Sequence, residues 1–237
     1  MNDPTGPASP PAIDQPARGA ALILCAVSAL AALAIGAGSW WPTGPVARPD
    51  AWIMLALRHA NADAASAGSP LYHVMVCATA VGAFPTLFLV VAFVAGLLAL
   101  GGRRGAAAGL VVRCGCGMAA AEILKHLVDR PRPTIVEHWT SFSSSSFPSG
   151  HSADSTIVYL LLAELAGRRL RTAAERRYVA GCAVALAMLV GTSRVFLGVH
   201  WPSDVLGGWA FGSAWVLLCR PREKPRARGV EPSASRA

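Results

Sequence analysis

The sequence predicts an all-α fold, a polytopic membrane helical bundle of about six transmembrane helices. Of its 237 residues, 54% are hydrophobic and only 14% are charged, which is too apolar for an ordinary soluble domain. Several apolar runs are long enough to cross a hydrocarbon core of about 30 Å as helices. Basic residues gather in short clusters beside these runs, and no alternating strand pattern competes.

The N-terminal region combines a polar tail with the first apolar run. Residues 1–18 are rich in Pro and Ala, show no apolar period, and predict a disordered cytoplasmic tail. Gly19–Gly38 is charge-free and is followed by Trp40 and Trp41, which suit a membrane interface. The tail carries only Arg18 as a cation and the run is long for a signal peptide, so we favour a retained span over a cleaved signal.

Five further spans complete the membrane domain, which we assign to residues 19–219. The second span lies within Leu71–Leu100, where Pro85 predicts a kink. The other four are expected at residues 106–128, 148–166, 178–199 and 203–219. Between the first two spans, Ala51–Arg58 is apolar but too short to span, and it predicts either an interfacial helix or a helix packed on the bundle.

Clusters of arginine and lysine predict the orientation. They separate the second span from the third and the fourth from the fifth, and they continue into a basic tail at residues 220–237. The positive-inside bias makes these segments cytoplasmic, with both termini inside. The net charge of +8 is then a feature of topology, and we expect no nucleic-acid partner. The six cysteines are scattered in apolar runs without ligand spacing, which predicts neither a disulfide nor a metal site.

Three polar motifs lie in or beside the outward loops. They read Lys125-(x6)-Arg132-Pro133, Pro148-Ser149-Gly150-His151 and Ser193-Arg194-(x5)-His200-(x3)-Asp204. Charged residues are expensive in a membrane bundle and are usually functional there. The placement of the motifs agrees with the charge bias, and the two observations are independent because they use different residues.

These residue types suit attack on a phosphate ester. The transition state gathers negative charge on the equatorial oxygens, so the site needs fixed positive charge and donors. We expect Lys125, Arg132 and Arg194 to supply the charge. Ser149 and Gly150 precede the fourth span, where backbone N–H groups at a helix N-terminus bind anions and glycine permits close approach.

The two histidines and the aspartate predict covalent catalysis. His200 is the expected nucleophile, because Asp204, four residues on, can hold its far ring nitrogen across a helical turn. His151 then protonates the leaving oxygen and later deprotonates the attacking water. Asp154 is a candidate to hold His151, and Glu122 is a candidate partner for Lys125.

Other residues near the motifs leave alternatives open. We expect Arg130 either to assist substrate binding or to meet lipid headgroups. The serine-rich stretch 141–146 predicts a flexible approach to the site. Arg113 is expected to snorkel or to pair with another helix.

In order and spacing, the three motifs resemble the complete tripartite motif of the type-2 phosphatidic acid phosphatase superfamily, in its membrane lipid phosphatase branch. The resemblance covers residues 125–204 and the surrounding spans. It implies the same roles for His200, His151 and Asp204, and it implies that neither a metal nor another cofactor is needed. We therefore expect a hydrolase in the bacterial inner membrane with its active site on the outer face.

The resemblance leaves the substrate open. Family substrates include undecaprenyl pyrophosphate, which we favour by analogy with compact members, lipid A, phosphatidate and phosphatidylglycerophosphate. Phosphotransfer to a lipid acceptor is an alternative that the motif does not distinguish from hydrolysis, and halide oxidation is another, because the superfamily includes vanadium haloperoxidases. A non-enzymatic lipid transporter or scaffold with a decayed site is a further alternative. The sequence does not indicate the oligomeric state.

Overall fold

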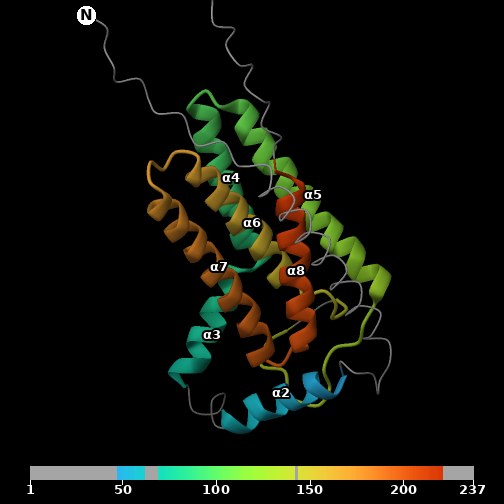
Figure 1. Ribbon diagram of the computed structural model, residues 1–237. Helices are drawn as coiled ribbons and strands as arrows, with labels where there is room; N and C mark the ends of the chain where they lie inside the picture. The colour runs from blue at the N-terminus through green and yellow to red at the C-terminus, as the bar shows by residue number, and fades with distance from the viewer. Residues whose placement is uncertain (1–46, 62–68, 142–143, 221–237) are drawn as a thin grey trace, which may run out of the picture.

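The computed structural model describes residues 47–61, 69–141 and 144–220, and all regular secondary structure in these segments is α-helical (Figure 1). The helices are α2 (Ala47–Ala60), α3 (Pro70–Val81), α4 (Phe84–Leu100), α5 (Arg104–Val128), α6 (Gly150–Gly167), α7 (Ala173–Phe196) and α8 (Pro202–Leu218). This confirms the all-α prediction. The N-terminal tail, the first predicted span and residues 221–237 lie outside the described residues.

The spans predicted from residue 71 onward correspond to helices, with one difference. The predicted kink in the second span is a break, because α3 ends at Val81 and α4 begins at Phe84 with a bend of 50° between them. Pro85 is the second residue of α4, a position where a proline removes no helical hydrogen bond. Within the described residues, α5 and α7 are long and apolar enough to cross a membrane, as is the bent α3–α4 pair if it is one span. The count of six spans stays a prediction.

Helix α6 is the centre of the bundle and packs against α4, α5, α7 and α8. Its buried residues Ile157 and Leu161 join Leu87, Leu110 and Val216 in the main apolar core. Small residues bring α6 and α8 close together, as is usual between membrane helices. A side chain at Gly208 of α8 would lie 2.8 Å from the carbonyl oxygen of Ser149, which precedes α6. The close packing fixes the starts of these two helices relative to each other.

The two ends of the bundle differ in character. The motif-bearing ends of α5, α6, α7 and α8 lie together, whereas Arg104 and Arg168 lie at the opposite ends of α5 and α6 (Figure 1). Between them, large apolar side chains such as Phe93 and Ile123 are exposed, as expected for helices that face lipid. Arg113 pairs with Glu164 of α6 at 2.8 Å, so the second of its two predicted arrangements is the one observed.

Helix α2 lies across the motif-bearing end of the bundle (Figure 1). The apolar octet predicted as a short helix is therefore helical, and the helix is longer than predicted. Trp52 is 72% exposed, whereas Asp50 and Met54 are buried against the bundle. At its far end, Arg58 donates to the carbonyl oxygen of Glu137 at 2.7 Å and stacks over Trp139. The helix is thus attached at two points.

Candidate active site

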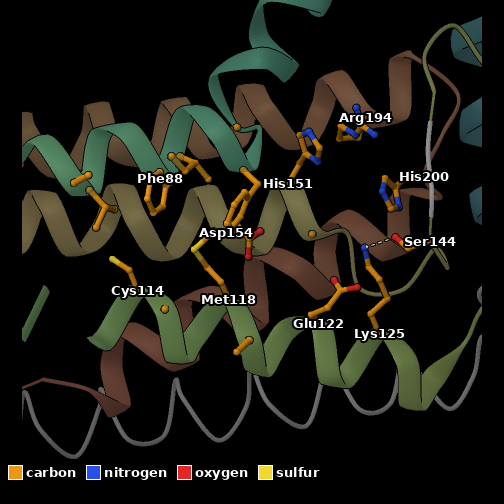
Figure 2. Close-up of a pocket in the computed structure, with 18 of the residues that line it drawn as sticks. Phe88, Cys114, Met118, Glu122, Lys125, Ser144, His151, Asp154, Arg194 and His200 are labelled. Carbon is orange, nitrogen blue, oxygen red and sulfur yellow. Dashed lines mark hydrogen bonds between the residues drawn. The ribbon is translucent and has the colours of Figure 1, made fainter. Parts of the chain in front are cut away.

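A cavity of about 790 Å³ opens among α4, α5 and α6, with a polar end at the motifs (Figure 2). The polar end is formed by Lys125, Arg132, Gly150, His151, Arg194 and His200. The rest is largely apolar and includes Leu87 and Phe88 of α4 and Met118 of α5. The cavity therefore combines a cationic head with a hydrophobic arm. Its shape suits an amphipathic ligand with an anionic group at one end.

His200 is positioned by a tight turn between α7 and α8. Helix α7 ends at Phe196, and Gly198 follows with φ of +80°, a conformation that favours glycine. A side chain at Gly198 would also lie 2.6 Å from the carbonyl oxygen of Glu137. The turn leaves His200 only 1% exposed while it still lines the cavity.

The two ring nitrogens of His200 face different partners. Nε2 lies 3.2 Å from Nη1 of Arg132. Because a guanidinium only donates, this contact favours an unprotonated Nε2 and a hydrogen on Nδ1. Nδ1 lies 3.5 Å from Oδ2 of Asp204. Nε2 therefore has the lone pair that a nucleophile needs, and this lone pair faces Arg132.

Asp204 reaches His200 by a different route from the one we expected. His200 precedes α8 and does not share a helical turn with Asp204. Asp204 is the third residue of α8, and its Oδ2 accepts the backbone N–H of Trp201 at 2.9 Å in a capping arrangement. Its carboxylate is completely buried and also accepts from Ser146 and Arg130. The helix cap thus orients the carboxylate that faces the histidine.

Burial controls the charge state of His200. It lowers the pKa of His200 from 6.5 to about 4, although the Asp204 carboxylate acts in the opposite direction. Burial likewise lowers the pKa of Arg132 from its ordinary value, and the Asp204 carboxylate again opposes the shift. Since an arginine titrates far above neutrality, the pair at neutral pH is a neutral imidazole beside a guanidinium.

The three cations of the motifs gather at the polar end, where several of their hydrogen bonds go to uncharged groups. Lys125 Nζ lies 3.3 Å from Ser144 Oγ, and Arg194 Nη1 donates to Thr79 Oγ1 at 2.7 Å. Arg132 donates to the backbone carbonyl oxygens of Ser144 and Val199, at 2.7 Å each. These bonds hold the side chains in place without cancelling their charge.

Arg194 also has an unused donor. It is 4% exposed, and its buried Nε has no hydrogen-bond partner among the described residues. A buried donor without a partner is costly unless a ligand completes it. Arg194 lines the cavity opposite Lys125, so an anion between them would supply the acceptor (Figure 2).

The second motif is divided between the cavity and the protein interior. Gly150 and His151 begin α6 and line the cavity, and a side chain at Gly150 would lie 3.3 Å from Lys125 Nζ. Ser149 is not among the residues lining the cavity. Its backbone N–H donates to the Asp204 carbonyl oxygen at 3.0 Å, and its buried hydroxyl accepts from Ser152 at 2.9 Å. In this structure Ser149 joins α6 to α8, away from the cations.

Several residues around the site have roles that differ from those predicted from the sequence. Arg130 is 6% exposed and bonds two carboxylates, those of Asp50 and Asp204, so it meets neither headgroups nor the cavity. Ser146 is completely buried, and Ser144 and Ser145 accept from Arg132, so these serines belong to the framework of the site. Serine and threonine are too common for sequence alone to identify such roles.

Two acidic residues line the cavity between its polar and apolar parts. Glu122 lies 3.4 Å from His126 and has no hydrogen bond to Lys125. Asp154 has one buried carboxylate oxygen without a hydrogen-bond partner in the described part of the chain, and no hydrogen bond between Asp154 and His151 is observed there. The same segments contain no cluster of His, Cys, Asp and Glu side chains suited to a metal ion.

Comparisons with known proteins relate the chain to membrane phosphatases. It is 38% identical over 102 residues to phosphatidylglycerophosphatase B of Bacillus subtilis, covering 42% of this chain and 49% of the relative. It is 31% identical over 112 residues to undecaprenyl-diphosphatase of Sulfolobus acidocaldarius, covering 45% and 50%. The matched part thus spans about half the length of these curated relatives.

A solved structure matches most of the fold. The crystal structure of a transmembrane PAP2 type phosphatidylglycerolphosphate phosphatase from Bacillus subtilis superimposes with a TM-score of 0.69 and 29% identity, over 84% of this chain and 93% of that one. The PAP2 superfamily model matches residues 106–226, just over half of the chain, and this range contains all three motifs. Motifs, fold and family model agree, and the chain belongs to the PAP2 superfamily.

Proposed function

We propose that this protein is a lipid phosphate phosphatase that works through a phosphohistidine intermediate. The observation that carries the proposal is the joining of three cations and two histidines to an apolar arm within one cavity of about 790 Å³. A phosphate group fits the cationic head, and the chain of a lipid fits the apolar arm. A soluble phosphate ester would leave the arm unused.

In the first chemical step, Nε2 of His200 attacks phosphorus. The bond from phosphorus to the ester oxygen breaks as the P–N bond forms, and His151 gives a proton to the leaving oxygen. Arg132, Lys125 and Arg194 stabilise the charge on the equatorial oxygens. Asp204 stabilises the positive charge that develops on the His200 ring, from 3.5 Å away.

In the second step, water replaces the histidine. His151, now unprotonated, takes a proton from the water as its oxygen attacks phosphorus, and the P–N bond breaks. Inorganic phosphate leaves, and His200 returns to its neutral state with the proton on Nδ1. Each residue recovers its starting charge, so the cycle needs no metal or other cofactor.

Two substrate classes have specific support. The likeness to phosphatidylglycerophosphate phosphatase extends over most of the fold, which favours a glycerolipid phosphate. The likeness to an undecaprenyl-diphosphatase supports a prenyl diphosphate, which is the substrate that we favoured from the sequence. In both classes an anionic head adjoins a long apolar chain, as the cavity requires.

We further infer that the site opens on the outer face of a bacterial inner membrane, with the C-terminus cytoplasmic. Arg103 and Arg104 lie at one end of α5 and Lys125 at the other. Arg168 and His151 are likewise at opposite ends of α6. The positive-inside bias assigns the arginine-rich end to the cytoplasm.

The experiment is phosphate release by the purified full chain in detergent, with EDTA present. Phosphatidylglycerophosphate, undecaprenyl diphosphate, lipid A and phosphatidate are tested in parallel, with His200→Ala as the control. Release from one lipid that disappears in the variant supports the proposal and identifies the substrate. A folded protein that releases phosphate from none of them overturns it, and phosphorylated lipid product without free phosphate would indicate a phosphotransferase.

A further inference from the structure

A buried acidic residue on α2 is connected to the catalytic aspartate. Asp50 is in the first turn of α2 and is only 2% exposed, although the helix lies on the surface of the bundle. A buried carboxylate is strongly unfavourable unless it is paired and hydrogen-bonded. The placement of Asp50 therefore requires a partner, and its contacts indicate what it does.

Among the described residues, the Asp50 side-chain oxygens accept hydrogen bonds only from the surroundings of Asp204. Oδ1 accepts the backbone N–H of Ser203 at 2.9 Å. Oδ2 accepts the Ser203 hydroxyl and Nη2 of Arg130, the latter at 2.9 Å. Ser203 immediately precedes Asp204 in the first turn of α8. Asp50 thus holds both the backbone beside the catalytic aspartate and the cation that neutralises it.

Arg130 connects the two carboxylates. Its Nη1 donates to Oδ1 of Asp204 and, at 2.7 Å, to the Ser203 hydroxyl, while Nη2 serves Asp50. The guanidinium plane is therefore determined at both ends. With Nη2 unpaired, the guanidinium would be free to turn toward Asp204 and draw that carboxylate away from the histidine. His200 Nδ1 lies 3.5 Å from Asp204 Oδ2 and makes no hydrogen bond among the described residues, so a further shift of the carboxylate would weaken an already long contact.

We propose that Asp50 is a positioning residue for the reaction. Through Arg130 and Ser203 it holds Asp204 in the orientation that keeps the proton of His200 on Nδ1. The surface helix α2 thereby supplies part of the catalytic geometry, 150 residues before the nucleophile in the chain. This inference rests on the proposed function, in which His200 is the nucleophile.

The test compares Asp50→Asn with Arg58→Gln in the full chain. Asparagine keeps the shape of Asp50 but removes its charge and turns a donor toward the guanidinium of Arg130. Arg58→Gln is the matched control, because it weakens the other attachment of α2 without touching Asp50 or Arg130. Both variants and the wild type are assayed with phosphatidylglycerophosphate and undecaprenyl diphosphate.

We expect Asp50→Asn to lower kcat by about 10- to 100-fold with KM changed less than about twofold, because misplacement by a fraction of an ångström acts on the chemical step. Arg58→Gln should retain kcat within about threefold. An unchanged kcat in folded Asp50→Asn, or an equal loss in Arg58→Gln, would overturn the proposal. If Asp50→Asn does not fold, Ser203→Ala replaces it in the test. This variant removes the hydroxyl that contacts Asp50 and Arg130. The proposal requires that it lower kcat without raising KM.

A second measurement is independent of turnover. In protein labelled with ¹⁵N-histidine, the His200 signal is identified by its loss in His200→Ala, and its nitrogen shifts report the tautomer. We expect the Nδ1–H form in the wild type and in Arg58→Gln, and a mixture of tautomers in Asp50→Asn. Wild-type tautomers in Asp50→Asn would overturn the inference. If the wild type releases no phosphate, the proposed function fails, while this comparison still shows whether Asp50 controls the tautomer of His200.

Discussion

His200 has cations on two sides: one side faces the protein interior, which we call the inner side, and the other faces the cavity. The cations on the two sides have hydrogen-bond partners of different charge. On the inner side, Arg130 is buried and bonds the carboxylates of Asp50 and Asp204. On the cavity side, the hydrogen bonds of Lys125 and Arg194 go to hydroxyl groups. Ion pairs neutralise the charge within the protein, whereas hydroxyl groups position a cation and leave its charge uncancelled.

We infer that this difference separates structural cations from those that we propose to bind the substrate. A guanidinium that bonds two carboxylates has little field left for a third anion. A guanidinium that donates to carbonyl oxygens, as Arg132 does, or to a hydroxyl group, as Arg194 does, still attracts phosphate. Arg130 and Arg132 are two residues apart in the sequence, and in the structure they have different partners. The comparison can be tested by removing charge on each side of the histidine.

The largest effect is expected on the inner side, from Asp204→Asn. Its carboxylate faces donors from Arg130, Ser146 and Trp201, and an asparagine amide has only one oxygen to accept them. We expect kcat to fall by about 10³- to 10⁴-fold, with residual activity above that of His200→Ala. Phosphate release under saturating lipid measures the loss. A fall of less than about tenfold would remove Asp204 from the catalytic group.

A somewhat smaller loss is expected on the cavity side, from Arg194→Gln. The change removes a charge and the donor Nε, which has no partner among the described residues. We expect kcat/KM to fall by about 10²- to 10³-fold, because the guanidinium acts on charge that develops in the transition state.

The matched control for Arg194 is Thr79→Val, which removes the hydroxyl that holds the guanidinium but keeps its charge. It should reduce kcat/KM by about tenfold or less. Equal losses in Arg194→Gln and Thr79→Val would show that position matters and charge does not, which would contradict the comparison.

The sequence predicted the cavity side better than the inner side. The sequence analysis identified these side chains because they are charged or titratable, lie within or beside apolar runs and fit the spacing of three motifs: Lys125, Arg132, His151, Arg194 and His200. The structure brings all five to one end of the cavity. Helix positions from residue 71 onward also followed from apolar runs of membrane length.

The inner side could not be predicted because its residues are ordinary or distant. Asp50 precedes an apolar octet, and nothing in the sequence distinguishes a buried aspartate there from a solvated one. Ser146 lies in a serine run that is typical of flexible loops, yet it is buried against Asp204. Ser149 belongs to a motif, but its hydroxyl points into the protein because α8 crosses α6 too closely to leave it in the cavity. Each of these outcomes depends on tertiary packing.

The apolar arm provides a third, weaker test. Phe88 lines the arm and is 59% exposed, so Phe88→Ala removes contact area for a lipid chain without disturbing the core. We expect kcat/KM for a long-chain lipid phosphate to fall by about tenfold, from the apolar area lost. Hydrolysis of a short-chain analogue with the same head should change by less than about twofold. Equal losses for both lipids would show that the arm does not bind the chain.

The smallest expected effect is a nearly flat response to mild acid. Attack requires neutral His200, and burial lowers its pKa from 6.5 to about 4, so the acid limb of kcat/KM should lie near the lower value. At about pH 5, protonation of His200 should reduce kcat/KM by less than about twofold, whereas a histidine of ordinary pKa would cost most of the activity; protonation of His151, the proposed general acid, sets a separate limb. Because the folded state binds this proton less tightly than the unfolded chain, His200 lowers the stability of the fold as pH falls from 6.5 toward 4, and folding must be monitored in parallel.

The phosphate of the substrate also titrates in this pH range. Two lipids whose phosphate pKa values differ are therefore compared, and the acid limb common to both belongs to the enzyme. A common limb near 6.5 would mean that His200 is protonated as easily as in water, and that the buried inner side does not control the nucleophile.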